Sequence, residues 1–165
     1  MNFNEFLDKL YESFENPASI TWNDIPGNIL IGSFEINSNY YRIECKYYDN
    51  DIFTFKFLVF DVATDKFTME LTDTDTNNKM RVIGTIREGM NYLIINKKPK
   101  GIIFSALDES FGRKLLYTRF SKEIVKNFNY DSETYKKDDY QVYYLYKDIS
   151  LELLLNVVGG LIDRI

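Results

Sequence analysis

The chain has 165 residues, 45% of them hydrophobic and 16% aromatic, so it is long enough to bury a core and is not a disordered tail. It contains no histidine and a single cysteine, Cys45, which excludes an internal disulfide, a Cys/His metal cluster and any Ser-His-Asp or Cys-His catalytic arrangement. The formal net charge of −5 disfavours a nucleic-acid partner, and suits either solubility or competition for a basic groove on another protein.

The N-terminal segment predicts an amphipathic helix that ends at Asn16-Pro17. Its apolar residues recur at helical spacing, and they are Phe3, Phe6, Leu7, Leu10 and Phe14. Asn, Glu and Asp lie between them, where a signal peptide would be basic and then continuously apolar. No apolar run has the length needed to span a membrane. We therefore expect an intracellular protein with no membrane partner.

An antiparallel meander is predicted after the stretch 20–28, which is rich in turn formers. Three segments dense in β-branched and aromatic residues make up the meander: residues 29–36, 40–48 and 52–60. Short polar breaks at 37–39 and 49–51 separate them and suit hairpins. Another turn at 61–65 precedes a strand over 66–72.

The second half of the chain alternates helix and strand. One helix ends near Asn96, and its apolar positions are Met80, Ile83, Ile86, Met90, Leu93 and Ile94. The wholly apolar segment 101–106 predicts a strand buried on both faces. A helix follows with apolar positions at Phe111, Leu115, Leu116, Phe120 and Ile124. A polar stretch over 129–139 then leads to a strand over 140–146.

A strand that feeds a helix and then a buried strand is a βαβ unit, so the sheet is expected to be mixed. No linker or internal repeat divides the chain. We predict a single mixed α/β domain over residues 1–165, in which the antiparallel meander continues into the βαβ unit.

The last segment, 150–165, predicts a helix that is apolar on more than one face and interrupted by Gly159-Gly160. Either it is the central helix of the core, or one side packs on another chain. The second reading predicts self-association or a protein partner. Its partner-binding residues would be Leu151, Leu154, Leu155, Val158, Leu161 and Ile162.

The segment "KMRVIGTIREG" contains the pattern R-x-x-G-x-I, and "RKLLYTRF" follows the next strand. Together with the order of elements, these motifs resemble the GNAT acyltransferase fold. The resemblance implies that backbone N–H groups at a helix N-terminus hold the pyrophosphate of acyl-CoA, and that Tyr117 protonates the departing thiolate. The pyrophosphate-binding residues would be Arg81, Val82, Ile83, Gly84, Thr85 and Ile86. Ile86 departs from the family pattern, which has a small residue there.

The segments "RVIGTIREGMNYLI", "KPKGIIFSA" and "RKLLYTRF" together resemble small α/β proteins of tailed bacteriophages. That resemblance implies an accessory protein without cofactor or catalysis. It would act in the host cytoplasm by binding a host or defence-system protein, or it would belong to the virion. The alternative is an acyl-CoA-dependent N-acyltransferase of GNAT type.

Two further patterns have structural readings. Asp73, Asp75 and Asn77 alternate as in a calcium loop, but Asn78 and Gly84 stand where that loop needs Gly and Glu, so we expect a polar connection and no metal. The tyrosine pairs that begin at positions 40, 47 and 143 have the residue type of base-stacking platforms, yet packing on a sheet face with period two explains them as well, and the acidic charge opposes a nucleic-acid role.

Overall fold

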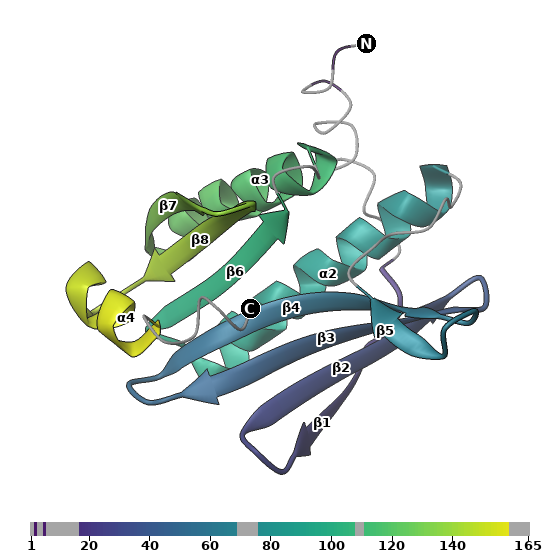
Figure 1. The fold of residues 1–165 in the computed structure, drawn as a ribbon, viewed down its shortest axis with the longest axis horizontal. Coiled ribbons are helices and arrows are strands. Elements are labelled where there is room, and N and C mark those ends of the chain that lie inside the picture. Colours follow the sequence, from purple (N-terminus) through teal and green to yellow (C-terminus); the bar gives the residue numbers. More distant parts are fainter. Residues whose placement is uncertain (1, 3–4, 6–16, 69–75, 108–110, 159–165) are drawn as a thin grey trace. The chain divides into compact units, whose positions relative to one another are not determined.

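The computed structural model describes residues 2, 5, 17–68, 76–107 and 111–158, which build one mixed sheet together with helices (Figure 1). The strands are β1 (Thr21–Ile25), β2 (Ile29–Ile36), β3 (Asn39–Tyr48), β4 (Ile52–Asp61), β5 (Lys66–Thr68), β6 (Gly101–Leu107), β7 (Asp131–Lys137) and β8 (Tyr140–Tyr146). The helices are α2 (Thr76–Lys97), α3 (Phe111–Phe128) and α4 (Leu151–Val158). The predicted N-terminal helix and residues 159–165 of the predicted C-terminal helix lie outside the described residues.

The sheet has the strand order β1-β2-β3-β4-β6-β8-β7, and β5 pairs with β4 beside this path. β4 and β6 are parallel. The pairs β1/β2, β4/β5, β6/β8 and β7/β8 are antiparallel. The predicted mixed α/β class is therefore confirmed.

The predicted meander is β2, β3 and β4, which are neighbours both in the chain and in the sheet. Its turns lie where the polar breaks predicted them. Asn37 and Ser38 have φ of 49° and 67°, and Asn50 and Asp51 have φ of 64° and 56°. Tight hairpin turns need positive φ at their central residues, and Asn and Asp tolerate it better than other side chains do.

No strand was predicted within residues 20–28, which were described only as rich in turn formers, but the structure has one there. Residues 21–25 form β1, which pairs with β2 so that Trp22 lies opposite Gly32. A Cβ at Gly32 would lie only 2.8 Å from the Trp22 ring, so the absence of a side chain there makes room for the indole. The turn itself lies in the connection between β1 and β2, where Gly27 and Asn28 have positive φ.

The βαβ unit has a different first strand from the one predicted. β6 runs parallel to β4, with Ile52 opposite Gly101, whereas β5 pairs antiparallel with β4. The crossover therefore starts at β4, and β5 is an added hairpin strand before α2.

No strand was predicted in the polar stretch over 129–139. Residues 131–137 form β7, which pairs along its length with β8. Its side chains are exposed on both faces, so it lacks the period-two pattern of a half-buried strand. Charged residues are typical of an edge strand, where they discourage pairing with other chains.

Contacts divide the chain into two compact units: the first unit is residues 1–45 with 57–96, and the second is residues 46–56 with 97–165. In the first unit, α2 packs on the sheet through Gly89, where a Cβ would overlap Ile43. The Trp22 ring stacks on Tyr92 of α2 with centroids 4.3 Å apart. The Thr85 hydroxyl of α2 accepts a hydrogen bond of 2.9 Å from the Ala18 N–H.

In the second unit, α3 and α4 cover opposite faces of β6 and β8. α3 contacts both strands, and Tyr117 of α3 packs on Phe104 and Tyr143. Leu154 of α4 belongs instead to a second cluster of buried residues, whose other members are Ile52, Ile103, Val142 and Tyr144. Successive residues of a strand point to opposite faces, so the two helices lie on different sides of these strands. This explains why the strand over 101–106 is buried throughout, as predicted.

Candidate functional site

The R-x-x-G-x-I segment lies inside α2. That helix begins at Thr76, so Arg81 is more than one turn from its first residue. Only the first four N–H groups of a helix lack an intrahelical partner, and those of Arg81 to Ile86 are used in the helix itself. Arg81 is exposed, whereas Val82, Gly84 and Ile86 are buried. In this position the segment does not present a helix N-terminus to a pyrophosphate.

Tyr117, the proton donor implied by the acyltransferase resemblance, is part of the core of the second unit. It is 2% exposed, and its ring lies 5.1 Å from that of Phe104 and 5.9 Å from that of Tyr143. The Tyr143 hydroxyl donates to the Lys114 carbonyl at 2.9 Å on the same helix. The arrangement around Tyr117 is that of an aromatic core, and Arg81 to Ile86 belong to the other unit.

The partner-binding residues predicted on the C-terminal helix differ in how far α4 buries them. Leu154 is fully buried and belongs to the core of the second unit. Leu151 and Leu155 are half-buried and pack against the same cluster. Leu153 is exposed at 36%. The side chain of Val158, and Leu161 and Ile162, lie outside the described part of the structure.

The sheet of the first unit offers a different candidate. On β2, β3 and β4, buried residues alternate with more exposed ones. The buried set faces the core: Phe34, Ile36, Tyr41, Ile43, Phe57 and Val59. The alternate set, together with Phe67 of β5, is called here the outer face: Ser33, Glu35, Tyr40, Arg42, Leu58, Phe60 and Phe67. Phe67 belongs with Phe60 because the two are opposite each other in the β4/β5 register.

Aromatic rings and one guanidinium dominate this outer face. Phe60 and Phe67 meet edge to face with centroids 5.2 Å apart. Arg42 lies over the Phe67 ring at 4.0 Å from its centroid, and its Nη1 is 3.4 Å from Glu44 Oε1. Tyr40 is 53% exposed. The outer face therefore carries large flat rings on neighbouring strands of the sheet.

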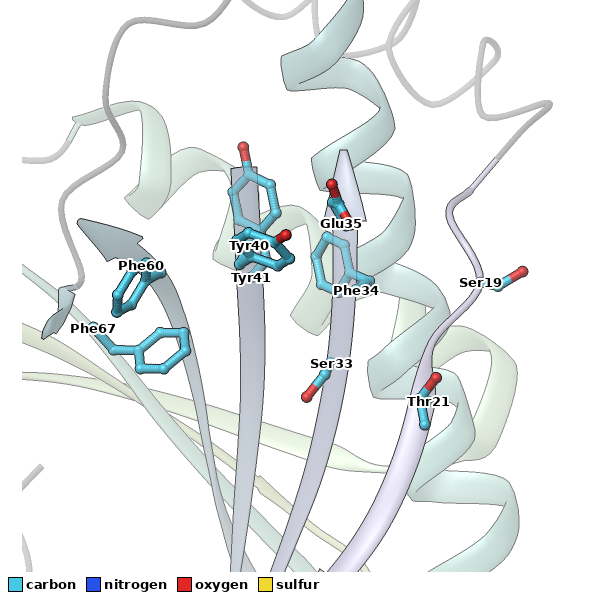
Figure 2. Close-up of a pocket in the computed structure, with 9 residues that line it drawn as sticks. All are labelled: Ser19, Thr21, Ser33, Phe34, Glu35, Tyr40, Tyr41, Phe60 and Phe67. Atoms are coloured by element: carbon cyan, nitrogen blue, oxygen red, sulfur yellow. The ribbon is translucent and has the colours of Figure 1, made fainter. Parts of the chain in front are cut away.

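An open pocket of about 520 Å³ hollows this part of the first unit (Figure 2). It is lined by Ser19, Thr21, Ser33, Phe34, Glu35, Tyr40, Tyr41, Phe60 and Phe67. Figure 2 shows Phe60 and Phe67 on one side and Ser19 and Thr21 on the other. Phe34 and Tyr41, which belong to the buried set, also border the pocket, and they stack on each other with centroids 5.1 Å apart. Burial raises the pKa of the Tyr41 hydroxyl.

Glu35 is the one charged residue among the nine that line the pocket. Its side chain is exposed, and it takes part in no salt bridge among the residues that the structure describes. The pocket therefore combines aromatic surface, hydroxyl groups and a single negative charge. This combination can receive a cationic group, because ring faces and a carboxylate both attract positive charge.

No other site type emerges from the described residues. Within them there is no group of three or more acidic or cysteine side chains that could hold a metal ion; Asp73 and Asp75 of the calcium-like pattern lie outside them. None of the helices described has the length and apolar character needed to cross a membrane.

Comparison of the chain with known protein families, with curated proteins and with solved structures finds no match. The site has therefore to be judged on its own geometry.

Only one sign of the outer face is visible in the sequence, the tyrosine at position 40. Among the tyrosine pairs at 40, 47 and 143, Tyr40 is exposed, whereas Tyr41, Tyr143 and Tyr144 are buried. The neighbours of Tyr40 in the pocket come from other strands, and only the register of the sheet brings them together.

Proposed function

We propose that the protein acts by binding another protein, without catalysis, as an accessory protein of a bacteriophage. Its role would be to inhibit a host or defence-system protein, or to serve within the virion. One observation carries the binding proposal: Tyr40, Phe60 and Phe67 of the outer face line the same pocket, and Tyr40 is 53% exposed. We call these three residues the aromatic row.

The composition of this surface is that of a binding site. Tyrosine, phenylalanine and arginine are enriched at protein interfaces, and truncations of Tyr and Arg are among the most costly there. Tyr40, Phe60, Phe67 and Arg42 supply these residue types on adjoining strands. A tyrosine side chain has only two torsions, so it loses little conformational freedom on binding, which favours affinity.

The two elements on which an acyltransferase reading depends have other uses in the chain. Arg81 to Ile86 lie within α2, and Tyr117 is packed between aromatic rings. A GNAT-like order of elements is compatible with a scaffold that performs binding, since one fold can carry unrelated functions. The bacteriophage setting rests on the sequence resemblance of the segments around residues 81–94, 98–106 and 113–120.

Selection from a random peptide display library tests the binding proposal, because it requires no choice of partner. The wild type is the bait, and the matched variants are Tyr40→Glu on the outer face and Ile95→Glu on α2, where Ile95 is 60% exposed. We expect enriched peptides that bind the wild type and Ile95→Glu but not Tyr40→Glu. Peptides that bind all three equally, or no enrichment, would contradict an outer-face binding site. Light scattering of the wild type alone shows whether the partner is a second copy of the chain.

A further inference from the structure

We infer that the pocket of the outer face receives a basic segment of the partner, with an arginine side chain stacked on the aromatic row and paired with Glu35. This inference rests on the proposed binding function and specifies the chemistry of the partner. It follows from the charges, the rings and the dimensions of the pocket.

The charges near the pocket leave Glu35 as the group that selects a ligand. Arg42 is already paired with Glu44 and stacked on Phe67. Lys66 directly precedes Phe67 on β5, and successive residues of a strand point to opposite faces, so Lys66 lies on the other side of the sheet from the Phe67 ring. Glu35 is exposed on the pocket wall, and the whole chain carries a formal net charge of −5. An approaching cation is attracted by both the local and the overall charge.

The rings favour arginine over lysine as that cation. Arg42 over Phe67 shows that the outer face already holds a guanidinium against an aromatic ring, at 4.0 Å from the centroid. Tyr40 offers a further ring, on a residue that is 53% exposed. A guanidinium is planar and weakly hydrated, so it can stack on a ring and at the same time donate two parallel hydrogen bonds to a carboxylate. A lysine ammonium is more strongly hydrated and lacks this fork.

The dimensions suit a peptide segment. A volume of about 520 Å³ exceeds that of one side chain, and the pocket is open along the sheet surface. Hydroxyl groups of Ser19 and Thr21 line it on the side opposite Phe60 and Phe67, and Ser33 lies between the two sides; these hydroxyl groups can hydrogen-bond the backbone of a bound chain (Figure 2). One end of the pocket therefore fits a stacked side chain, and the other fits polar main chain.

The test measures fluorescence anisotropy of a labelled, end-blocked tetra-arginine peptide. The variants are Glu35→Gln and Tyr40→Leu in the pocket, and Glu133→Gln on β7 is the matched control, since Glu133 is also an exposed carboxylate on a strand. All three positions are exposed, and circular dichroism confirms that the variants fold.

We expect each pocket variant to weaken binding of tetra-arginine about 5- to 30-fold, since a stacked or paired guanidinium contributes roughly 1–2 kcal/mol, and the control to leave it unchanged. Tetra-lysine should bind more weakly, and added salt should weaken both peptides. Equal binding to Glu35→Gln and Glu133→Gln would mean general attraction to an acidic protein, and would overturn the inference. No binding of tetra-arginine would overturn it as well.

The display selection separates this failure from failure of the proposed function. Peptides that depend on Tyr40 but carry no arginine and tolerate Glu35→Gln would leave the outer face as a binding site with a different ligand. Absence of any peptide that depends on Tyr40 would remove the binding site itself.

Discussion

Shortening Leu154 to alanine tests whether α4 belongs to the core of the second unit. Leu154 is fully buried and packs with Ile52, Ile103, Val142 and Tyr144. Removing the atoms beyond Cβ forfeits about 0.8 kcal/mol of transfer free energy per carbon. A cavity is left as well, so the total loss of unfolding free energy should be about 2–5 kcal/mol. Leu153→Ala, at the neighbouring exposed position, should change it by less than about 0.5 kcal/mol.

Gly101 provides a second substitution that couples to the first. A Cβ at Gly101 would lie 2.7 Å from Leu154 Cδ1 and 3.1 Å from Ile52 Cγ1. Gly101→Ala alone therefore overpacks this place and should cost about 1–3 kcal/mol. In the Leu154→Ala background the new methyl group enters space that the leucine has left. The double variant should then be more stable than the sum of the single effects predicts, by about 1–2 kcal/mol.

Urea unfolding followed by far-ultraviolet circular dichroism measures all four variants against the wild type. Leu154→Ala should also lower the melting temperature by roughly 4–20 °C, since 1 kcal/mol shifts a domain of this size by roughly 2–4 °C. If Leu154→Ala costs no more than Leu153→Ala, α4 does not pack as described. If the effects of Leu154→Ala and Gly101→Ala add within about 0.5 kcal/mol, the two sites do not share a contact.

Three further substitutions test other parts of the fold. Gly89→Val should destabilise the first unit by about 1–3 kcal/mol in urea unfolding, because its side chain would overlap Ile43 beneath α2. Thr85→Val should cost about 1–3 kcal/mol by leaving the Ala18 N–H without its acceptor, whereas Thr85→Ser should retain most of the stability in the same assay. Burial raises the pKa of Tyr130 to about 12, above its unfolded value of about 10, so the folded state favours the neutral phenol. The stability that this contributes is present below pH 10 and lost between pH 10 and 12, and urea midpoints of Tyr130→Phe should fall less over that interval than those of the wild type.

The sequence predicted those strands whose residue pattern matches the burial of their side chains in the fold. The strands over 29–36, 40–48 and 52–60 were found because aromatic and β-branched residues alternate there and polar turns bound them. β1 and β7 were missed for opposite reasons. β1 is short and runs directly into a Pro-Gly turn, and Trp22 packs only because Gly32 and Tyr92 flank it. β7 is polar on both faces, so it forms through backbone pairing with β8, which local sequence does not encode.

The candidate site was less predictable because it depends on register. Glu35, Tyr40, Phe60 and Phe67 come from four strands, and they share a pocket only when those strands pair as they do. A shift of one residue in any strand would turn its side chain to the opposite face. The sequence motif that suggested a cofactor site, by contrast, was local, and local patterns of this length arise often by chance.

The choice between α4 and the outer face as the binding surface follows from what each leaves exposed. The leucine-rich pattern of α4 suggested that one domain cannot bury so many aliphatic side chains, but the second unit buries Leu154 fully and Leu151 and Leu155 in part. Leu153 alone among the described leucines of α4 is exposed, at 36%. On the outer face, Tyr40 is 53% exposed, and the half-buried rings of Phe60 and Phe67 adjoin it in one pocket. Binding energy comes mainly from a few clustered aromatic and arginine residues, so the one exposed leucine in the described part of α4 is a weaker anchor than the rings of Tyr40, Phe60 and Phe67. The proposed interface therefore belongs on the sheet of the first unit.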